Sequence, residues 1–112
     1  MKHDGSSIEL SLVNKHLEDL NPISCGWQDC VPGHAFGPAV RRYTLIHYVM
    51  EGRGSFFARG KEYPVREGEA FLIRPDEATT YRADWDKPWE YLWIGFTGRM
   101  SKQFHTLPAV IR

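Results

Sequence analysis

Three aromatic residues near the end of the sequence have the spacing of a binding wall. Trp89, Tyr91 and Trp93 stand two positions apart, so on an extended strand their side chains point to one face. Aromatic rings suit the apolar C–H faces of a sugar ring, and a tyrosine hydroxyl adds a directional hydrogen bond. In a closed barrel this face is either the interior, where the rings would wall a pocket, or the outer surface. Plain core packing is the alternative role for the same rings.

Other side chains along the sequence could add polar contacts. Tyr81 either contacts a ligand through its hydroxyl or meets a backbone carbonyl inside the core. Arg74 ends an apolar run, where its guanidinium either holds a carboxylate or a pair of hydroxyls, or stays in solvent. His34 lies in a Pro-Gly-His segment, and Trp85 lies in a polar loop that suits either a dimer contact or a lid. We expect His47 to be a core or wall histidine rather than a catalyst, because no carboxylate or nucleophile stands beside it.

The histidines and cysteines do not indicate metal or thiol chemistry. None of the five histidines stands at the spacing of a metal-ligand pair. Cys25 and Cys30 are the only cysteines, and they are too far apart for a Cys-x-x-Cys motif. We expect both to be ordinary buried thiols, with a disulfide as the less favoured alternative. The sequence therefore predicts no metal, no cofactor and no catalytic residue.

The composition narrows the class of protein. A chain of 112 residues suits one domain, and 42% hydrophobic with 13% aromatic residues is too apolar for a disordered tail. Lys plus Arg and Asp plus Glu both number 14, without a basic cluster, which argues against strong DNA binding by this segment. No run approaches the roughly 20 apolar residues of a membrane span. The N-terminal residues lack the charged and then apolar pattern of a secretory signal peptide. We expect a cytoplasmic protein with no membrane contact.

Short strands would position the candidate residues. From Pro22 onward, apolar and aromatic runs alternate with clusters of Gly, Pro and Asp. The predicted strands are 23–27, 43–50, 55–59, 62–65, 70–74, 79–83 and 89–96. Short strands with turns at such close intervals favour an antiparallel barrel or sandwich over βαβ units. The fold class is therefore all-β, a small antiparallel β-barrel.

The two ends of the chain have a different pattern. Four apolar residues before Pro22 recur at three- and four-residue intervals: Leu10, Val13, Leu17 and Leu20. This spacing predicts a short helix that ends before Pro22, or a pendant arm. A weaker helical face after Gly98 predicts a connector. We therefore divide the chain into an N-terminal arm (1–21), a barrel (22–98) and a helical connector (99–112).

Four motifs mark the predicted barrel: IHYVMEGRG at 46–54, GKEY at 60–63, REGEAFLIRP at 66–75 and WEYLWIGF at 89–96. With these motifs, residues 43–98 resemble the cupin-like ligand-binding domain of AraC-family transcription regulators, which has a jelly-roll barrel. The segment from Cys25 to Pro38 is similar to the sugar-responsive members.

The resemblance implies a ligand site and a set of partners. The ligand-stacking tryptophan of the family and a polar contact two residues before it correspond to Trp93 and Tyr91, and Tyr81 matches a position whose hydroxyl contacts sugar. His34 lies near another polar contact, whereas an arginine used by some members has no obvious counterpart. The implied ligand is a small molecule, in particular a carbohydrate. The implied partners are a second copy in a homodimer, and DNA only through a helix-turn-helix domain outside this chain.

A small cupin enzyme, such as a sugar isomerase or epimerase, is the alternative function. Cupin enzymes hold a metal through a His-x-His pair, a glutamate and a third histidine. In this sequence Phe36 stands where the partner of His34 would be, Leu45 stands about where the glutamate falls, and Thr80 follows the Pro75 turn. We therefore expect a binding module rather than an enzyme. A dimerisation domain without a ligand is a third, weaker interpretation.

Overall fold

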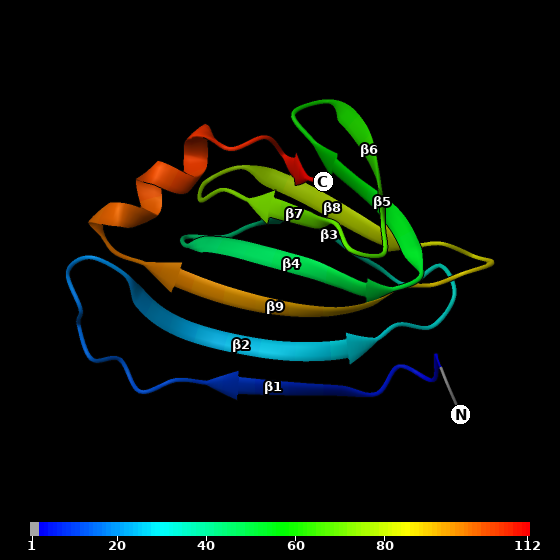
Figure 1. Ribbon diagram of the computed structural model, residues 1–112, viewed down its shortest axis with the longest axis horizontal. Coiled ribbons are helices and arrows are strands. Elements are labelled where there is room, and N and C mark those ends of the chain that lie inside the picture. Colours follow the sequence, from blue (N-terminus) through cyan, green and yellow to red (C-terminus); the bar gives the residue numbers. More distant parts are fainter. Residues whose placement is uncertain (1–2) are drawn as a thin grey trace.

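Ten strands and one 3-10 helix make up the regular structure of residues 3–112, the part of the chain described by this computed structural model (Figure 1). The strands are β1 (Ser7–Ser11), β2 (Asn21–Asp29), β3 (Ala35–Val40), β4 (Thr44–Glu51), β5 (Arg53–Ala58), β6 (Lys61–Arg66), β7 (Ala70–Ile73), β8 (Ala78–Ala83), β9 (Glu90–Thr97) and β10 (Val110–Ile111). The helix, η1, spans Arg99–Thr106. No helix within residues 3–112 is long and apolar enough to cross a membrane.

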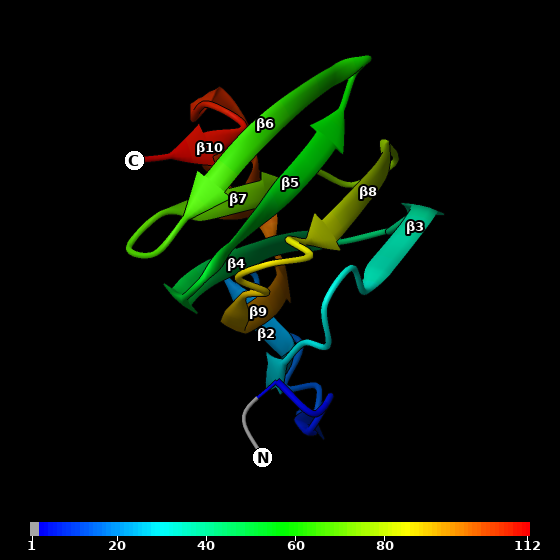
Figure 2. The same cartoon turned by 90° about the vertical axis from the view of Figure 1, so that its right-hand side faces the viewer.

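The strands form two sheets that face each other (Figure 2). The larger sheet has the order β1-β2-β9-β4-β7-β10, and the smaller has the order β3-β8-β5-β6. Every pair of neighbouring strands in both sheets is antiparallel. The prediction of an all-β antiparallel architecture is confirmed.

Aromatic rings fill the core between the sheets. Phe56 from β5 and Phe71 from β7 are fully buried and stack with their ring centroids 4.8 Å apart. Trp89, just before β9, is also fully buried and lies 5.3 Å from the ring of Phe71. Gly54 makes room for this indole, because a Cβ at that position would come within 2.5 Å of it. Trp89 therefore belongs to the packed core.

Of the two alternatives predicted for the N-terminal segment, a short helix or an arm, the helix is not formed, because residues 7–11 form strand β1. Strand β1 pairs along its whole length with β2, from Ser7 opposite Gln28 to Ser11 opposite Ser24. Its residues also alternate with a period of two, since Ile8 and Leu10 point to one face while Ser7, Glu9 and Ser11 point to the other. Pairing with a neighbouring strand outweighs the weak helical spacing of the leucines. Residues 12–20 contain no helix and are exposed.

Strands β3 and β10 were not among the predicted strands. In β3, the register with β8 shifts between Phe36 and Ala39, at the Gly37–Pro38 dipeptide, so this segment lacks the regular alternation that marks a strand. Strand β10 has two residues and completes the larger sheet by pairing with β7. The helical segment expected after Gly98 is present as η1, which lies at one end of the molecule (Figure 1).

Candidate ligand-binding site

A pocket of about 260 Å³ lies between the two sheets. It is lined by residues from β1, β2, β3, β4, β8 and β9 and from the connection between β3 and β4: Ser7, Glu9, Ser24, Gln28, Phe36, Arg41, Tyr43, Leu45, His47, Tyr81, Tyr91 and Trp93. The lining combines aromatic rings with hydroxyl, amide, imidazole, guanidinium and carboxylate groups. Such a combination suits a ligand that has both apolar faces and hydroxyl groups.

The register of the larger sheet brings these side chains together. His47 on β4 lies opposite Trp93 on β9, and Trp93 lies opposite Gly26 on β2. Gly26 in turn lies opposite Glu9 on β1. Residues directly opposite one another on neighbouring strands point to the same face of a sheet. His47, Trp93 and Glu9 therefore form a row across the inner face.

Gly26 allows the indole of Trp93 to lie flat against the sheet. A Cβ at Gly26 would stand 2.2 Å from both Cζ2 and Cη2 of Trp93 and 2.6 Å from the carbonyl oxygen of Ile8. Carbon atoms in ordinary contact are about 3.5–4.0 Å apart. Any larger residue at this position would therefore push Trp93 away from its place in the wall.

The imidazole of His47 lies at the inner end of the pocket within a cluster of rings. It stacks on Phe71 with 4.6 Å between ring centroids, and the rings of Tyr81 and Tyr91 are both 4.9 Å away. The residue is only 2% exposed, and its Nδ1 has no hydrogen-bond partner within residues 3–112. Burial, together with the positive charge of Arg41, lowers the pKa of His47 to about 3. The imidazole is therefore neutral at physiological pH.

Two tyrosine hydroxyls flank this imidazole. The hydroxyl of Tyr91 donates a hydrogen bond to Oε1 of Gln28 at 3.1 Å. Burial raises the pKa of both Tyr91 and Tyr81 above the ordinary tyrosine value, so both stay protonated and can donate as well as accept. Cys30 lies beneath them, and burial raises the pKa of its thiol to about 11. The two cysteines are free thiols, as predicted, but Cys30 is buried whereas Cys25 is only half-buried.

Arg41 is a pocket residue that the sequence did not reveal. Its guanidinium carbon lies 4.5 Å above the ring centroid of Phe36, and Phe36 stacks on Tyr81 with 5.6 Å between centroids. This stack places a positive charge in the wall formed by the smaller sheet. Arg41 follows the unrecognised strand β3, so nothing in the sequence pattern indicated which way it faces.

The structure brings together only part of the predicted site. Trp93, Tyr91 and Tyr81 all line the pocket, whereas Trp89 lies in the core. His34 does not line the pocket, and Arg74 donates a hydrogen bond to the carbonyl oxygen of Leu107 at 2.9 Å, in a separate hollow. Their contact with a ligand of this pocket is therefore not supported by the geometry.

Trp85 lies away from the pocket as well. Trp85 is 73% exposed. One side of its indole covers Gly33, where a Cβ would come within 2.5 Å of the ring. The loop that carries it is held by the carboxylate of Asp84, which accepts hydrogen bonds from the backbone N–H groups of Asp86 and Lys87.

The pocket does not fit a metal ion. Phe36 and Leu45 line it at two of the positions where a metal-binding cupin would carry ligands, and the side chains of both lack donor atoms. The pocket holds one imidazole, His47, and one carboxylate, Glu9. Within residues 3–112 no group of three His, Cys, Asp or Glu side chains is arranged to hold a metal ion.

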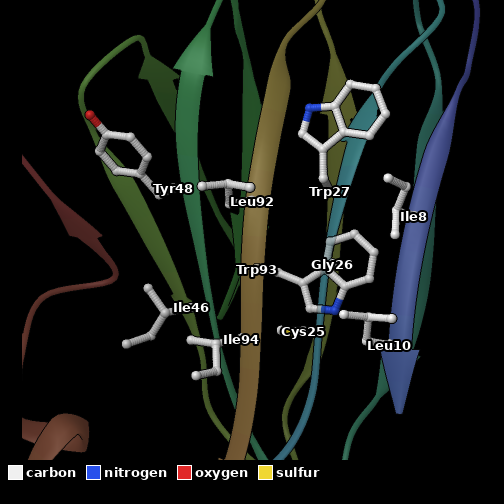
Figure 3. A pocket seen from close by; sticks show the side chains of 10 residues that line it. All are labelled: Ile8, Leu10, Cys25, Gly26, Trp27, Ile46, Tyr48, Leu92, Trp93 and Ile94. Atoms are coloured by element: carbon white, nitrogen blue, oxygen red, sulfur yellow. The ribbon is translucent and has the colours of Figure 1, made fainter. Parts of the chain in front are cut away.

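A second, larger hollow of about 500 Å³ lies on the outer face of the larger sheet. Figure 3 shows the side chains that surround it, which come from β1, β2, β4 and β9: Ile8, Leu10, Cys25, Trp27, Ile46, Tyr48, Leu92 and Ile94. Gly26 and Trp93 also border it, so Trp93 belongs to the walls of both hollows. Its lining is almost entirely apolar, which suits a packed protein surface and not a ligand rich in hydroxyl groups.

Comparison with protein families shows that residues 21–108 match a model described as the AraC-like ligand binding domain. The Msm operon regulatory protein of Streptococcus mutans is 38% identical over 84 residues, which make up 75% of this chain and 30% of that protein. The raffinose operon regulatory protein RafR of Pediococcus pentosaceus is 37% identical over 89 residues, 78% of this chain and 32% of that protein. The chain thus spans about a third of the length of these relatives.

Solved structures with a similar fold include a protein described as a cupin barrel. The protein YhaK from Escherichia coli superposes with a TM-score of 0.74 and 16% identity, covering 94% of this chain and 49% of that one. A cupin 2 conserved barrel domain protein from Salinispora arenicola superposes with a TM-score of 0.66 and 16% identity, covering 94% of this chain and 86% of that one. At such low identity the similarity shows the fold alone, and it confirms the predicted cupin-like barrel.

Proposed function

Because the chain belongs to the family of AraC-like ligand binding domains, we propose that its pocket binds a carbohydrate and that this binding controls an AraC-type transcription regulator in the cytoplasm. DNA would be bound by a helix-turn-helix domain outside this chain. The relatives are named as regulators of the Msm and raffinose operons, which supports a sugar as the ligand. We further propose that the chain has no enzymatic activity of its own.

The observation that carries this proposal is the composition of the pocket wall. Trp93 offers an aromatic face, and the hydroxyls of Tyr81 and Tyr91 lie beside it with the amide of Gln28. A sugar ring presents apolar C–H faces and a rim of hydroxyl groups, so it can stack on the indole while its hydroxyls meet the polar groups. The volume of about 260 Å³, equal to about nine water molecules, has room for one sugar ring.

Exposure increases from one end of the pocket to the other. His47, Tyr91 and Tyr81 at the inner end are 2–7% exposed, whereas Phe36 is 38% exposed and Ser7 and Glu9 on β1 are exposed. The mouth of the pocket is therefore formed partly by the N-terminal strand. A ligand that contacts Glu9 would favour the state in which β1 is paired with β2. This differential affinity is what a ligand needs to shift a regulator between two states.

The protonation state of His47, the imidazole that lines the pocket, favours binding over catalysis. A general base needs a pKa near the operating pH and a partner that orients it. His47 has a pKa of about 3, and its nearest neighbours are the aromatic rings of Phe71, Tyr81 and Tyr91. It is suited to hold a hydroxyl group and not to remove a proton.

A thermal-shift and calorimetry screen with raffinose, lactose, galactose and glucose tests the proposal. A sugar present at a hundred times its Kd stabilises the protein by about 2.7 kcal/mol, which for a chain of this size raises Tm by about 10 °C. If none of these sugars binds at millimolar concentration, the proposal of a carbohydrate ligand is refuted.

The Trp93→Phe variant then tests the position of the site. It keeps an aromatic wall but reduces the stacking area, so we expect a three- to tenfold loss of affinity, in line with the roughly 0.5–1.5 kcal/mol of an aromatic contact. Trp85→Phe is the matched control, because Trp85 is 73% exposed and lies outside the pocket. Unchanged affinity in Trp93→Phe would place the site elsewhere.

A further inference from the structure

We propose that His47 is a direct ligand contact and that it makes the pocket select an uncharged sugar ring over the phosphate ester of the same sugar. This inference rests on the proposed function, since it assigns a residue and a ligand class to the same pocket. It is carried by an unpaired polar atom on a residue at the inner end of the pocket and by the balance of charges around the ligand space.

The unpaired atom is Nδ1 of His47. Buried polar atoms in proteins nearly always have a hydrogen-bond partner, and an unpaired one destabilises the fold. The rings around this imidazole do not supply one: Phe71 carries no polar atom, and neither Tyr81 nor Tyr91 forms a hydrogen bond with Nδ1. His47 lines the pocket, but its Nδ1 is sealed from solvent, so the imidazole has to turn for this nitrogen to pair with a hydroxyl of the bound ligand.

The charges around the pocket favour a neutral ligand. Arg41 and Glu9 are the charged side chains in the lining, one of each sign. Burial keeps the pKa of His47 near 3 and those of Tyr81 and Tyr91 raised, so these three groups are uncharged. A phosphate group carries a charge of about −1.5 to −2 at pH 7. Arg41 would attract this group and Glu9 would repel it, so the pocket has no net positive charge to offset the cost of moving the phosphate out of water.

A neutral imidazole fits the hydroxyl groups of a sugar in a way that a cationic one would not. The uncharged ring has one nitrogen that donates and one that accepts, and a hydroxyl can do both. The same neutral ring adds no positive charge that could attract a phosphate. His47 therefore provides polarity without charge at the deepest point of the pocket.

Two variants of His47 separate ligand contact from packing. His47→Phe keeps a flat ring against Phe71 but removes both nitrogens, and His47→Asn keeps a polar group near the position of Nδ1. Because Nδ1 is unpaired without ligand, we expect His47→Phe to have an unchanged or higher Tm in the ligand-free state. Its affinity for whichever of galactose, glucose, lactose and raffinose binds the wild type should fall at least tenfold, and His47→Asn should retain more of that affinity.

The charge argument is tested with galactose and glucose against galactose 6-phosphate and glucose 6-phosphate. In the wild type we expect each phosphate ester to bind at least tenfold more weakly than its parent sugar. Glu9→Gln removes the repelling carboxylate at the exposed mouth, so this difference should become smaller. Neither comparison depends on the folding of the His47 variants.

The possible results separate this inference from the proposed function. If the wild type binds none of the sugars, the proposed function fails and this inference fails with it. If the wild type binds a sugar but His47→Phe binds it equally well, or loses Tm without losing affinity, His47 is a packing residue and only this inference is overturned. Equal or tighter binding of a phosphate ester would overturn the proposed selectivity in the same way.

Discussion

Replacing Gly26 by alanine tests where the indole of Trp93 lies. The new Cβ would stand 2.2 Å from Cζ2 and Cη2 of that ring, so the ring has to move by more than about 1 Å to restore an ordinary contact. Overpacking of this kind costs about 1–3 kcal/mol. Alanine also restricts the unfolded chain, which returns about 0.4–1 kcal/mol. We expect Gly26→Ala to lower the free energy of unfolding by about 1–2 kcal/mol and to weaken ligand binding.

The decisive comparison places Gly26→Ala in a Trp93→Phe background. Phenylalanine has no atoms equivalent to Cζ2 and Cη2, so only the approach to the carbonyl oxygen of Ile8 at 2.6 Å remains. The alanine should therefore cost about 1 kcal/mol less in this background than in the wild type. Urea unfolding of the wild type, both single variants and the double variant measures this coupling free energy.

Gly95→Ala is the matched control for this cycle. A Cβ at Gly95 would approach Tyr43, Ser24 and Leu45, and its three nearest atoms do not include Trp93. Its cost should be the same with Trp93 and with Phe at position 93. If Gly26→Ala also costs the same in both backgrounds, Trp93 does not lie over Gly26 and the pocket wall is placed wrongly.

Three further predictions concern metal content, pH and association. Purified protein should contain no stoichiometric zinc, iron or manganese by elemental analysis; one bound equivalent whose chelation lowers Tm would contradict this. Hydrogen bonds from the backbone N–H groups of Lys87 and Asp86, and the charge of Arg53, lower the pKa of Asp84 below 3.8, so its contribution to stability is present above that pH and is lost as the pH falls through its folded pKa. Between pH 5 and pH 2, Asp84→Asn should therefore lose less of its neutral-pH stability than the wild type does. An equal drop of the urea midpoint from its neutral-pH value in both proteins would refute this. Sedimentation equilibrium should show a homodimer, and a monomer at every concentration would contradict that expectation.

The pattern of alternation predicted which residues share a face, but not how deep each lies. Tyr91 and Trp93 line the pocket as their spacing indicates. Trp89 has the same spacing, yet it is fully buried against Phe71, because the sheets close over the core at the start of β9. A period of two defines the face of a strand. The position of the pocket along that strand depends on the opposite sheet, which the local sequence does not describe.

The missed half of the pocket comes from segments with an irregular pattern. Phe36 and Arg41 belong to β3 and the connection after it, where Gly37 and Pro38 interrupt the alternation and shift the register. Glu9 lies in the segment 1–21, where the helical spacing of the apolar residues that follow it predicts a helix or an arm. In both cases long-range pairing, with β8 and with β2, determines the structure more than local pattern does. The motifs of the central strands were regular and predicted the barrel correctly.

The strand order of the larger sheet has a consequence for synthesis on the ribosome. Strand β9 lies between β2 and β4. Its residue Ile94 lies opposite Cys25 of β2 on one side and opposite Ile46 of β4 on the other. At roughly 5–20 residues per second, about 3–12 s pass between the synthesis of β2 and that of β9. During this time the exposed apolar residues of β2 and β4 have no partner strand between them, and pairing over such long sequence separations is slow. Folding of the nascent barrel therefore has to wait for its last long strand, and until then its unpaired strand edges are prone to aggregation.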